Sequence, residues 1–131
     1  MRLLVDTNRF ADLVANNRSA HERLQQASEV WRSVITIGEL LAGFSQGLRQ
    51  AQNERRLADL LDLQGVNVLL LGRDTPRYYS NVWKTLRAQG TKIPTNDVWI
   101  AAQALEHDLI VDTCDHHFEY IPGLKIIGMN E

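Results

Sequence analysis

Short apolar runs rich in β-branched residues alternate along this chain with segments of helical periodicity, and this alternation limits the fold most strongly. The strand-like runs are residues 2–5, 30–37, 66–71 and 109–111, with a weaker one at 125–127. Apolar residues at three- and four-residue spacing predict helices over 8–16, 19–27, 37–47, 52–63, 75–89 and 96–107. Nearly apolar strands separated by helices are typical of a parallel sheet covered on both faces. The sequence therefore predicts an α/β fold.

The length and composition indicate one ordinary globular unit. A chain of 131 residues supports a single core, so we expect one domain over residues 1–131. No apolar run approaches the roughly 20 residues of a membrane span, and Met1 leads directly into a strand-like run. The single cysteine, Cys114, has no partner for an internal disulfide. We expect a cytoplasmic protein with no membrane segment.

Four acidic residues lie at the ends of apolar stretches: Asp6, Glu39, Asp97 and Asp115. In open parallel sheets, ligands bind beyond the carboxyl ends of the strands, and helix starts face the same rim. Four carboxylates within about 5 Å of one another repel by roughly 3 kcal/mol per pair at an effective dielectric of about 20. A divalent cation removes this repulsion, and oxygen ligands suit hard cations. The pattern predicts a site for Mg²⁺, with Mn²⁺ as the alternative.

Each acid also has a structural interpretation. Thr36 and Glu39 have the spacing of a capping box, and Asp97 suits a first helical turn. Asp6 is placed to cap the next helix and Asp115 to close a turn. Taken together, the four positions favour a shared site. We expect no histidine ligand: neighbours on a strand or turn point apart, so one of His116 and His117 is expected to pack beside Phe118.

The segments around the acids carry a family resemblance. They read Leu-Leu-Val-Asp6-Thr-Asn8, Ile-Thr-Ile-Gly-Glu39-Leu-Leu-Ala-Gly43, Asn96-Asp97-Val-Trp-Ile-Ala-Ala102, and Thr113-Cys-Asp115-His-His117-Phe118 followed by Ile121-Pro-Gly-Leu124. In this order and spacing the chain resembles the PIN-domain ribonucleases of the VapC toxin type. The resemblance implies a three-layer α/β/α sandwich with a mostly parallel central sheet of four to five strands.

The same resemblance implies a Mg²⁺-dependent endoribonuclease, the toxin of a type II toxin–antitoxin system, which forms a homodimer and is inhibited by a cognate antitoxin. Asp6, Glu39, Asp97 and Asp115 match the catalytic and metal-binding acids of the family, with Asp6 and Asp97 as the main direct ligands. Asn8 and Thr113 match positions that support the acids by hydrogen bonds. A metal-activated water is then expected to cleave RNA to a 5′-phosphate and a 3′-hydroxyl.

The formal net charge of −2 excludes no partner, because metal binding to four carboxylates reverses the balance. For RNA contact we single out Arg9, near the expected site, and Lys92, in the turn before Asp97. Two alternatives are a non-catalytic module that binds RNA or protein and a phosphatase of the haloacid dehalogenase type. The phosphatase chemistry needs a second aspartate two residues after the first, where this chain has Asn8.

Overall fold

A five-stranded, fully parallel sheet forms the centre of the molecule in a computed structural model, which describes residues 1–129. Asn130 and Glu131, which belong to the predicted domain 1–131, lie outside the described residues. The strands are β1 (Arg2–Val5), β2 (Glu29–Ser33), β3 (Val66–Leu69), β4 (Ile110–Asp112) and β5 (Ile126–Ile127), in the order β3-β2-β1-β4-β5. The strand order therefore reverses at β1, which lies between β2 and β4. The predicted α/β class and the mostly parallel sheet of four to five strands are confirmed.

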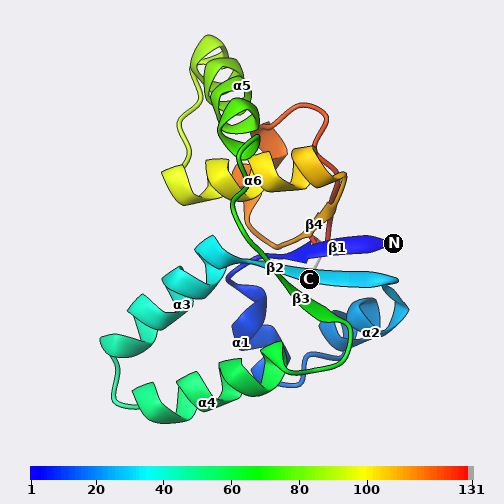
Figure 1. Cartoon of the computed structure of the whole chain (residues 1–131), viewed down its shortest axis with the longest axis vertical. Coiled ribbons are helices and arrows are strands. Elements are labelled where there is room, and N and C mark those ends of the chain that lie inside the picture. The colour runs from blue at the N-terminus through cyan, green and yellow to red at the C-terminus, as the bar shows by residue number, and fades with distance from the viewer. Residues whose placement is uncertain (130–131) are drawn as a thin grey trace.

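Helices cover both faces of this sheet (Figure 1). They are α1 (Arg9–Val14), α2 (Arg18–Gln26), α3 (Val34–Ser45), α4 (Gln50–Leu61), α5 (Thr75–Gln89) and α6 (Thr95–His107), with a 3₁₀ helix, η1, over His116–Tyr120. In Figure 1, α5 and α6 lie above the sheet, and α1, α2 and α4 lie below it. The arrangement is the predicted three-layer α/β/α sandwich.

The core is divided by the sheet because successive strand residues point to opposite faces. Leu4 of β1 packs with Ile100 of α6 and Phe118 of η1, all three fully buried. Leu3 and Val5, its neighbours in β1, pack on the other face. In β4, Val111 and Ile110 likewise pack on the two opposite faces. Both strands are thus fixed between two apolar layers, which positions the residues that follow their carboxyl ends.

The junction of β2 and α3 differs from the sequence prediction. Strand β2 ends at Ser33, so the predicted strand 30–37 is wrong from residue 34 onward. The Ser33 hydroxyl accepts a 3.0 Å hydrogen bond from the Ile35 backbone N–H and caps α3, which overrides the β preference of the following residues. Thr36 is then buried inside the helix, so the capping-box interpretation of Thr36 and Glu39 is also wrong.

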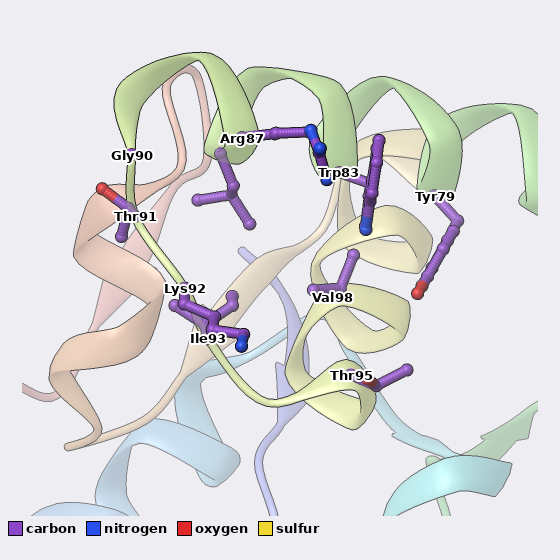
Figure 2. A pocket seen from close by; sticks show the side chains of 10 residues that line it. Tyr79, Trp83, Arg87, Gly90, Thr91, Lys92, Ile93, Thr95 and Val98 are labelled. Carbon is purple, nitrogen blue, oxygen red and sulfur yellow. The ribbon is translucent and has the colours of Figure 1, made fainter.

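A groove of about 340 Å³ runs between α5 and the segment that enters α6 (Figure 2). Its lining combines an exposed indole with two cations: the Arg87 guanidinium lies 5.1 Å from the centre of the Trp83 ring, and Lys92 is exposed in the turn. Thr95, the first residue of α6, also lines the groove.

Over residues 1–129, no helix has the length and apolar character needed to cross a membrane.

Candidate metal centre

Asp6 lies directly after the carboxyl end of β1, the central strand at which the strand order reverses. Its side chain is buried, and two hydrogen bonds fix its carboxylate. Oδ1 accepts from the Thr7 backbone N–H at 2.7 Å, and Oδ2 accepts from the Thr113 hydroxyl at 2.8 Å. Thr113 follows β4, the strand paired with β1, so the two adjacent strands jointly orient this carboxylate.

Asp115 is held to the same point through Thr113. The Asp115 backbone N–H donates to the Thr113 hydroxyl at 2.9 Å, and Asp115 Oδ1 accepts from the His117 backbone N–H at 3.0 Å. This second bond caps η1, so the predicted turn-closing role of Asp115 is present. It leaves the second oxygen of Asp115 and a further lone pair of Oδ1 for a ligand, because an ionised carboxylate has about four acceptor sites.

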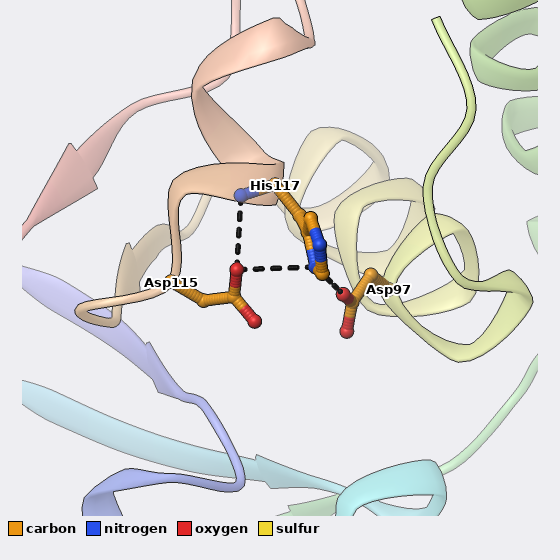
Figure 3. Close-up of side chains that lie close together, drawn as sticks. All are labelled: Asp97, Asp115 and His117. Atoms are coloured by element: carbon orange, nitrogen blue, oxygen red, sulfur yellow. Dashed lines mark hydrogen bonds and ion pairs between the residues drawn. The ribbon is translucent and has the colours of Figure 1, made fainter.

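Asp97 reaches the site from helix α6. It lies in the first turn of α6 and its side chain is buried. Its Oδ2 lies 2.9 Å from Nδ1 of His117, and the same nitrogen lies 3.1 Å from Oδ1 of Asp115 (Figure 3). One donor atom from each of Asp97, Asp115 and His117 lies within 4.8 Å of the other two, a spacing that a single metal ion can bridge.

Glu39 completes the acidic group from α3. Its Oε1 accepts a 2.8 Å hydrogen bond from the Thr7 hydroxyl, next to Asp6. The charges of Glu39 and Asp115 both raise the pKa of Asp6, and the charges of Asp6 and Asp115 both raise the pKa of Asp97. The structure therefore brings all four predicted acids to one end of the sheet.

The electrostatics of this cluster fit a cation. The pKa of Asp97 is raised to about 6, mainly by burial and also by the charges of Asp6 and Asp115, while the hydrogen bond to His117 opposes the shift. Burial also raises the pKa of Asp6, with the Thr113 and Thr7 hydrogen bonds opposing the shift. Burial disfavours the charged forms of these carboxylates, and a positive ion bound beside them would favour those forms. Several carboxylate oxygens together with one imidazole nitrogen are donors that suit a divalent metal ion.

Three residues beside the acids were not expected from the sequence. One of His116 and His117 was predicted to pack beside Phe118, but the ring of His117 points into the acidic cluster. Thr7 supports Glu39. Arg32 in β2 is buried and interacts electrostatically with Asp6. Burial lowers the pKa of Arg32 to about 10, and the charges of Asp112 and Asp6 oppose this shift, so the guanidinium stays protonated at neutral pH. Of these three residues, only Thr7 had a sequence signal, because it directly follows Asp6.

Two predicted residues lie differently from expectation. Asn8 is exposed before α1, and its side chain makes no capping hydrogen bond to that helix. Arg9 is only 1% exposed: its Nε donates to Asp112 at 3.0 Å, and an Nη donates to the carbonyl of Gly128 at 2.6 Å. The predicted RNA contact of Arg9 is therefore wrong, because the guanidinium is used inside the protein.

Comparison with known proteins decides the family. A sequence model of the PIN domain matches residues 3–124. The chain belongs to the PIN domain family. Its relatives include Ribonuclease VapC4 of Mycobacterium tuberculosis, which is 31% identical over 96% of this chain and 95% of the relative. This PIN domain is therefore of the VapC type, as the sequence motifs predicted.

Solved structures agree with this assignment. VapBC-1 from nontypeable Haemophilus influenzae matches the PIN domain over its full length and that of the solved chain, with 29% identity and a TM-score of 0.87. VapBC-5 from Mycobacterium tuberculosis, a member of the VapBC family of toxin–antitoxin systems, has 27% identity over 97% of this chain and 98% of that one, with a TM-score of 0.74.

Proposed function

We propose that this chain, as one domain over residues 1–131, is a Mg²⁺-dependent endoribonuclease and the toxin of a type II toxin–antitoxin system that acts in the cytoplasm. The observation that carries the proposal is the convergence of Asp6, Glu39, Asp97 and Asp115, with buried Asp6 and Asp97 made less acidic by their surroundings. The relative named Ribonuclease VapC4 supports the reaction class.

The four acids would hold the ion, with Asp6 and Asp97 as its main ligands and Asp115 and Glu39 beside them. When bound, the ion supplies a nucleophilic water at neutral pH and stabilises negative charge on the phosphate. Thr113 fixes the carboxylate of Asp6 and the backbone of Asp115, and Thr7 fixes the carboxylate of Glu39. Asn8, exposed beside Thr7, is a further proposed supporting residue. Mg²⁺ is favoured because most of the donors are oxygens.

Cleavage of internal phosphodiester bonds is the direct test. The purified chain should cut RNA with Mg²⁺, and cleavage should stop with EDTA or in Asp97→Asn. Asp74→Asn is the matched control, since Asp74 is exposed before α5 and its side chain makes no capping bond. Equal behaviour of wild type, EDTA-treated protein and Asp97→Asn would support the non-catalytic alternative. Release of phosphate from a phosphomonoester without internal cleavage would instead support phosphatase chemistry.

End-group analysis separates two routes to cleavage. Attack by a metal-activated water leaves a 5′-phosphate and a 3′-hydroxyl. A 2′,3′-cyclic phosphate would show that the RNA's own 2′-hydroxyl is the nucleophile, and the proposed role of the metal would then be wrong.

RNA is proposed to enter along the groove of Figure 2, which leads to the start of α6 two residues before Asp97. Lys92 is placed to neutralise a backbone phosphate, and the exposed Trp83 ring offers a stacking surface for a base. Lys92→Gln should weaken RNA binding and lower the salt dependence of that binding. Lys84→Gln is the control, because Lys84 is also exposed, on α5, but does not line the groove.

A cognate antitoxin and a second copy of the chain are the proposed protein partners. The VapBC-5 structure comes from a family of toxin–antitoxin systems. Uncompensated carboxylates would attract an arginine or lysine of the antitoxin, which would compete with the metal. Co-purification with the product of an adjacent reading frame, and loss of inhibition when its basic residues are replaced, test the first partner. Light scattering of the purified toxin tests the homodimer.

A further inference from the structure

The imidazole of His117 is positioned between two carboxylates of the metal centre. Nδ1 lies 2.9 Å from Oδ2 of Asp97 and 3.1 Å from Oδ1 of Asp115. Figure 3 shows the ring entering from η1 while Asp97 comes from α6. Two segments 20 residues apart in the chain therefore meet at one ring nitrogen.

The fold holds the ring in this position. The Asp115 cap of η1 binds the His117 backbone N–H, which fixes the residue two positions after the acid. The next residue, Phe118, is fully buried in the core and anchors the turn. His116, by contrast, points outward to Glu119 and is exposed.

A hydrogen bond explains only one of the two close contacts. Neutral imidazole has a single N–H, and a proton on Nδ1 points in one direction. It therefore makes a well-directed hydrogen bond to only one of the two carboxylates, although both lie at nearly the same distance. Adjacent ligand atoms around an ion with bonds of about 2.1 Å are separated by roughly 3 Å. The two observed distances match this separation.

We propose that Nδ1 of His117 is a direct ligand of the divalent cation held by Asp97 and Asp115, and that this nitrogen raises the affinity of the site for Mn²⁺ relative to Mg²⁺. The inference rests on the proposed metal-dependent function and adds a residue to it. Imidazole binds Mn²⁺ more readily than Mg²⁺, which prefers carboxylate and water oxygens. Coordination through Nδ1 leaves the proton on Nε2.

Pulsed electron paramagnetic resonance on the Mn²⁺-loaded protein tests direct ligation. Wild type and His116→Gln should show hyperfine coupling to a directly bound imidazole nitrogen, and His117→Gln should not. By calorimetry, His117→Gln should lose about tenfold in Mn²⁺ affinity and clearly less in Mg²⁺ affinity. His116→Gln should retain both affinities, since its ring lies outside the cluster.

Absence of nitrogen coupling in Mn²⁺-loaded wild type would overturn the inference, whatever the variants do. An equal loss of Mn²⁺ and Mg²⁺ affinity in His117→Gln would overturn the proposed metal preference. The underlying function is assessed separately by RNA cleavage with Mg²⁺: cleavage without nitrogen coupling leaves the ribonuclease proposal standing, and nitrogen coupling without cleavage leaves only the ligand assignment.

Discussion

The hydroxyl of Thr113 donates a 2.8 Å hydrogen bond to Oδ2 of Asp6 and connects this acid to the loop that carries Asp115. The same oxygen accepts from the Asp115 backbone N–H at 2.9 Å. Thr113 is fully buried, so no water replaces either bond without rearrangement. One side chain thus connects the carboxylate of Asp6 to the backbone of Asp115, which comes from a distant part of the chain.

Replacing Thr113 by valine should weaken metal binding. Thr113→Val keeps the volume and removes both bonds, so we expect Mg²⁺ affinity to fall by about tenfold or more, as for other residues that orient metal ligands. Thr113→Ser should restore much of it. Calorimetric titration measures the affinity, and Thr85→Val on the exposed face of α5 is the control. Unchanged affinity in Thr113→Val would show that backbone geometry alone orients Asp6.

Replacing Glu39 by glutamine should reduce activity without destabilising the fold. The amide oxygen can still accept from Thr7, but a negative charge is lost beside Asp6, so we expect RNA cleavage to fall by about tenfold or more. Because Ser33 caps α3, the free energy of unfolding should change by less than about 0.5 kcal/mol. A loss of about 1 kcal/mol in urea unfolding would restore the capping role that the structure contradicts.

Most of the site was predictable because its acids follow local signals. Asp6 comes directly after an apolar strand, and Asp97 lies in the first turn of a helix with clear periodicity. The convergence then follows from parallel-sheet topology. Glu39 was singled out with the other acids because it follows an apolar stretch, but its local structure was predicted wrongly because the capping contact of Ser33 overrides β propensity.

The residues that sequence reasoning missed depend on tertiary contacts. The rule that adjacent side chains point apart holds for His116 and His117, but it does not say which ring turns inward; the cap of η1 decides that. Arginine is normally exposed, so nothing in the sequence placed Arg9 or Arg32 in the interior. Their burial follows from Asp112, a partner about 100 residues from Arg9.

Removing Asp112 should destabilise the protein. Its carboxylate is buried between Arg9, whose Nε lies at 3.0 Å, and Arg23, whose Nε lies at 3.2 Å. Asp112→Ala leaves buried positive charge without its carboxylate, so we expect unfolding free energy to fall by about 3–5 kcal/mol. Urea unfolding measures the loss, with the exposed Asp62→Ala as control.

Metal binding separates the role of Asp112 from those of the four site acids. The folded fraction of Asp112→Ala should bind Mg²⁺ close to normally, because Asp112 faces the arginines rather than the acidic cluster. A stable Asp112→Ala protein that no longer binds Mg²⁺ would instead identify Asp112 as a ligand.

The stability of the metal-free protein should depend on Asp97 and on pH. The folded state raises the pKa of Asp97 from 3.8 to about 6, mainly through burial. Between these values the folded state binds more protons than the unfolded state, so unfolding free energy decreases as pH rises, by about 3 kcal/mol for this group. In EDTA, Asp97→Asn should therefore gain stability relative to wild type between pH 4 and pH 7. Adding Mg²⁺ at pH 7 should stabilise wild type far more than the variant. A stability difference between wild type and Asp97→Asn that stays constant across this pH range would show that folding does not raise the pKa of Asp97.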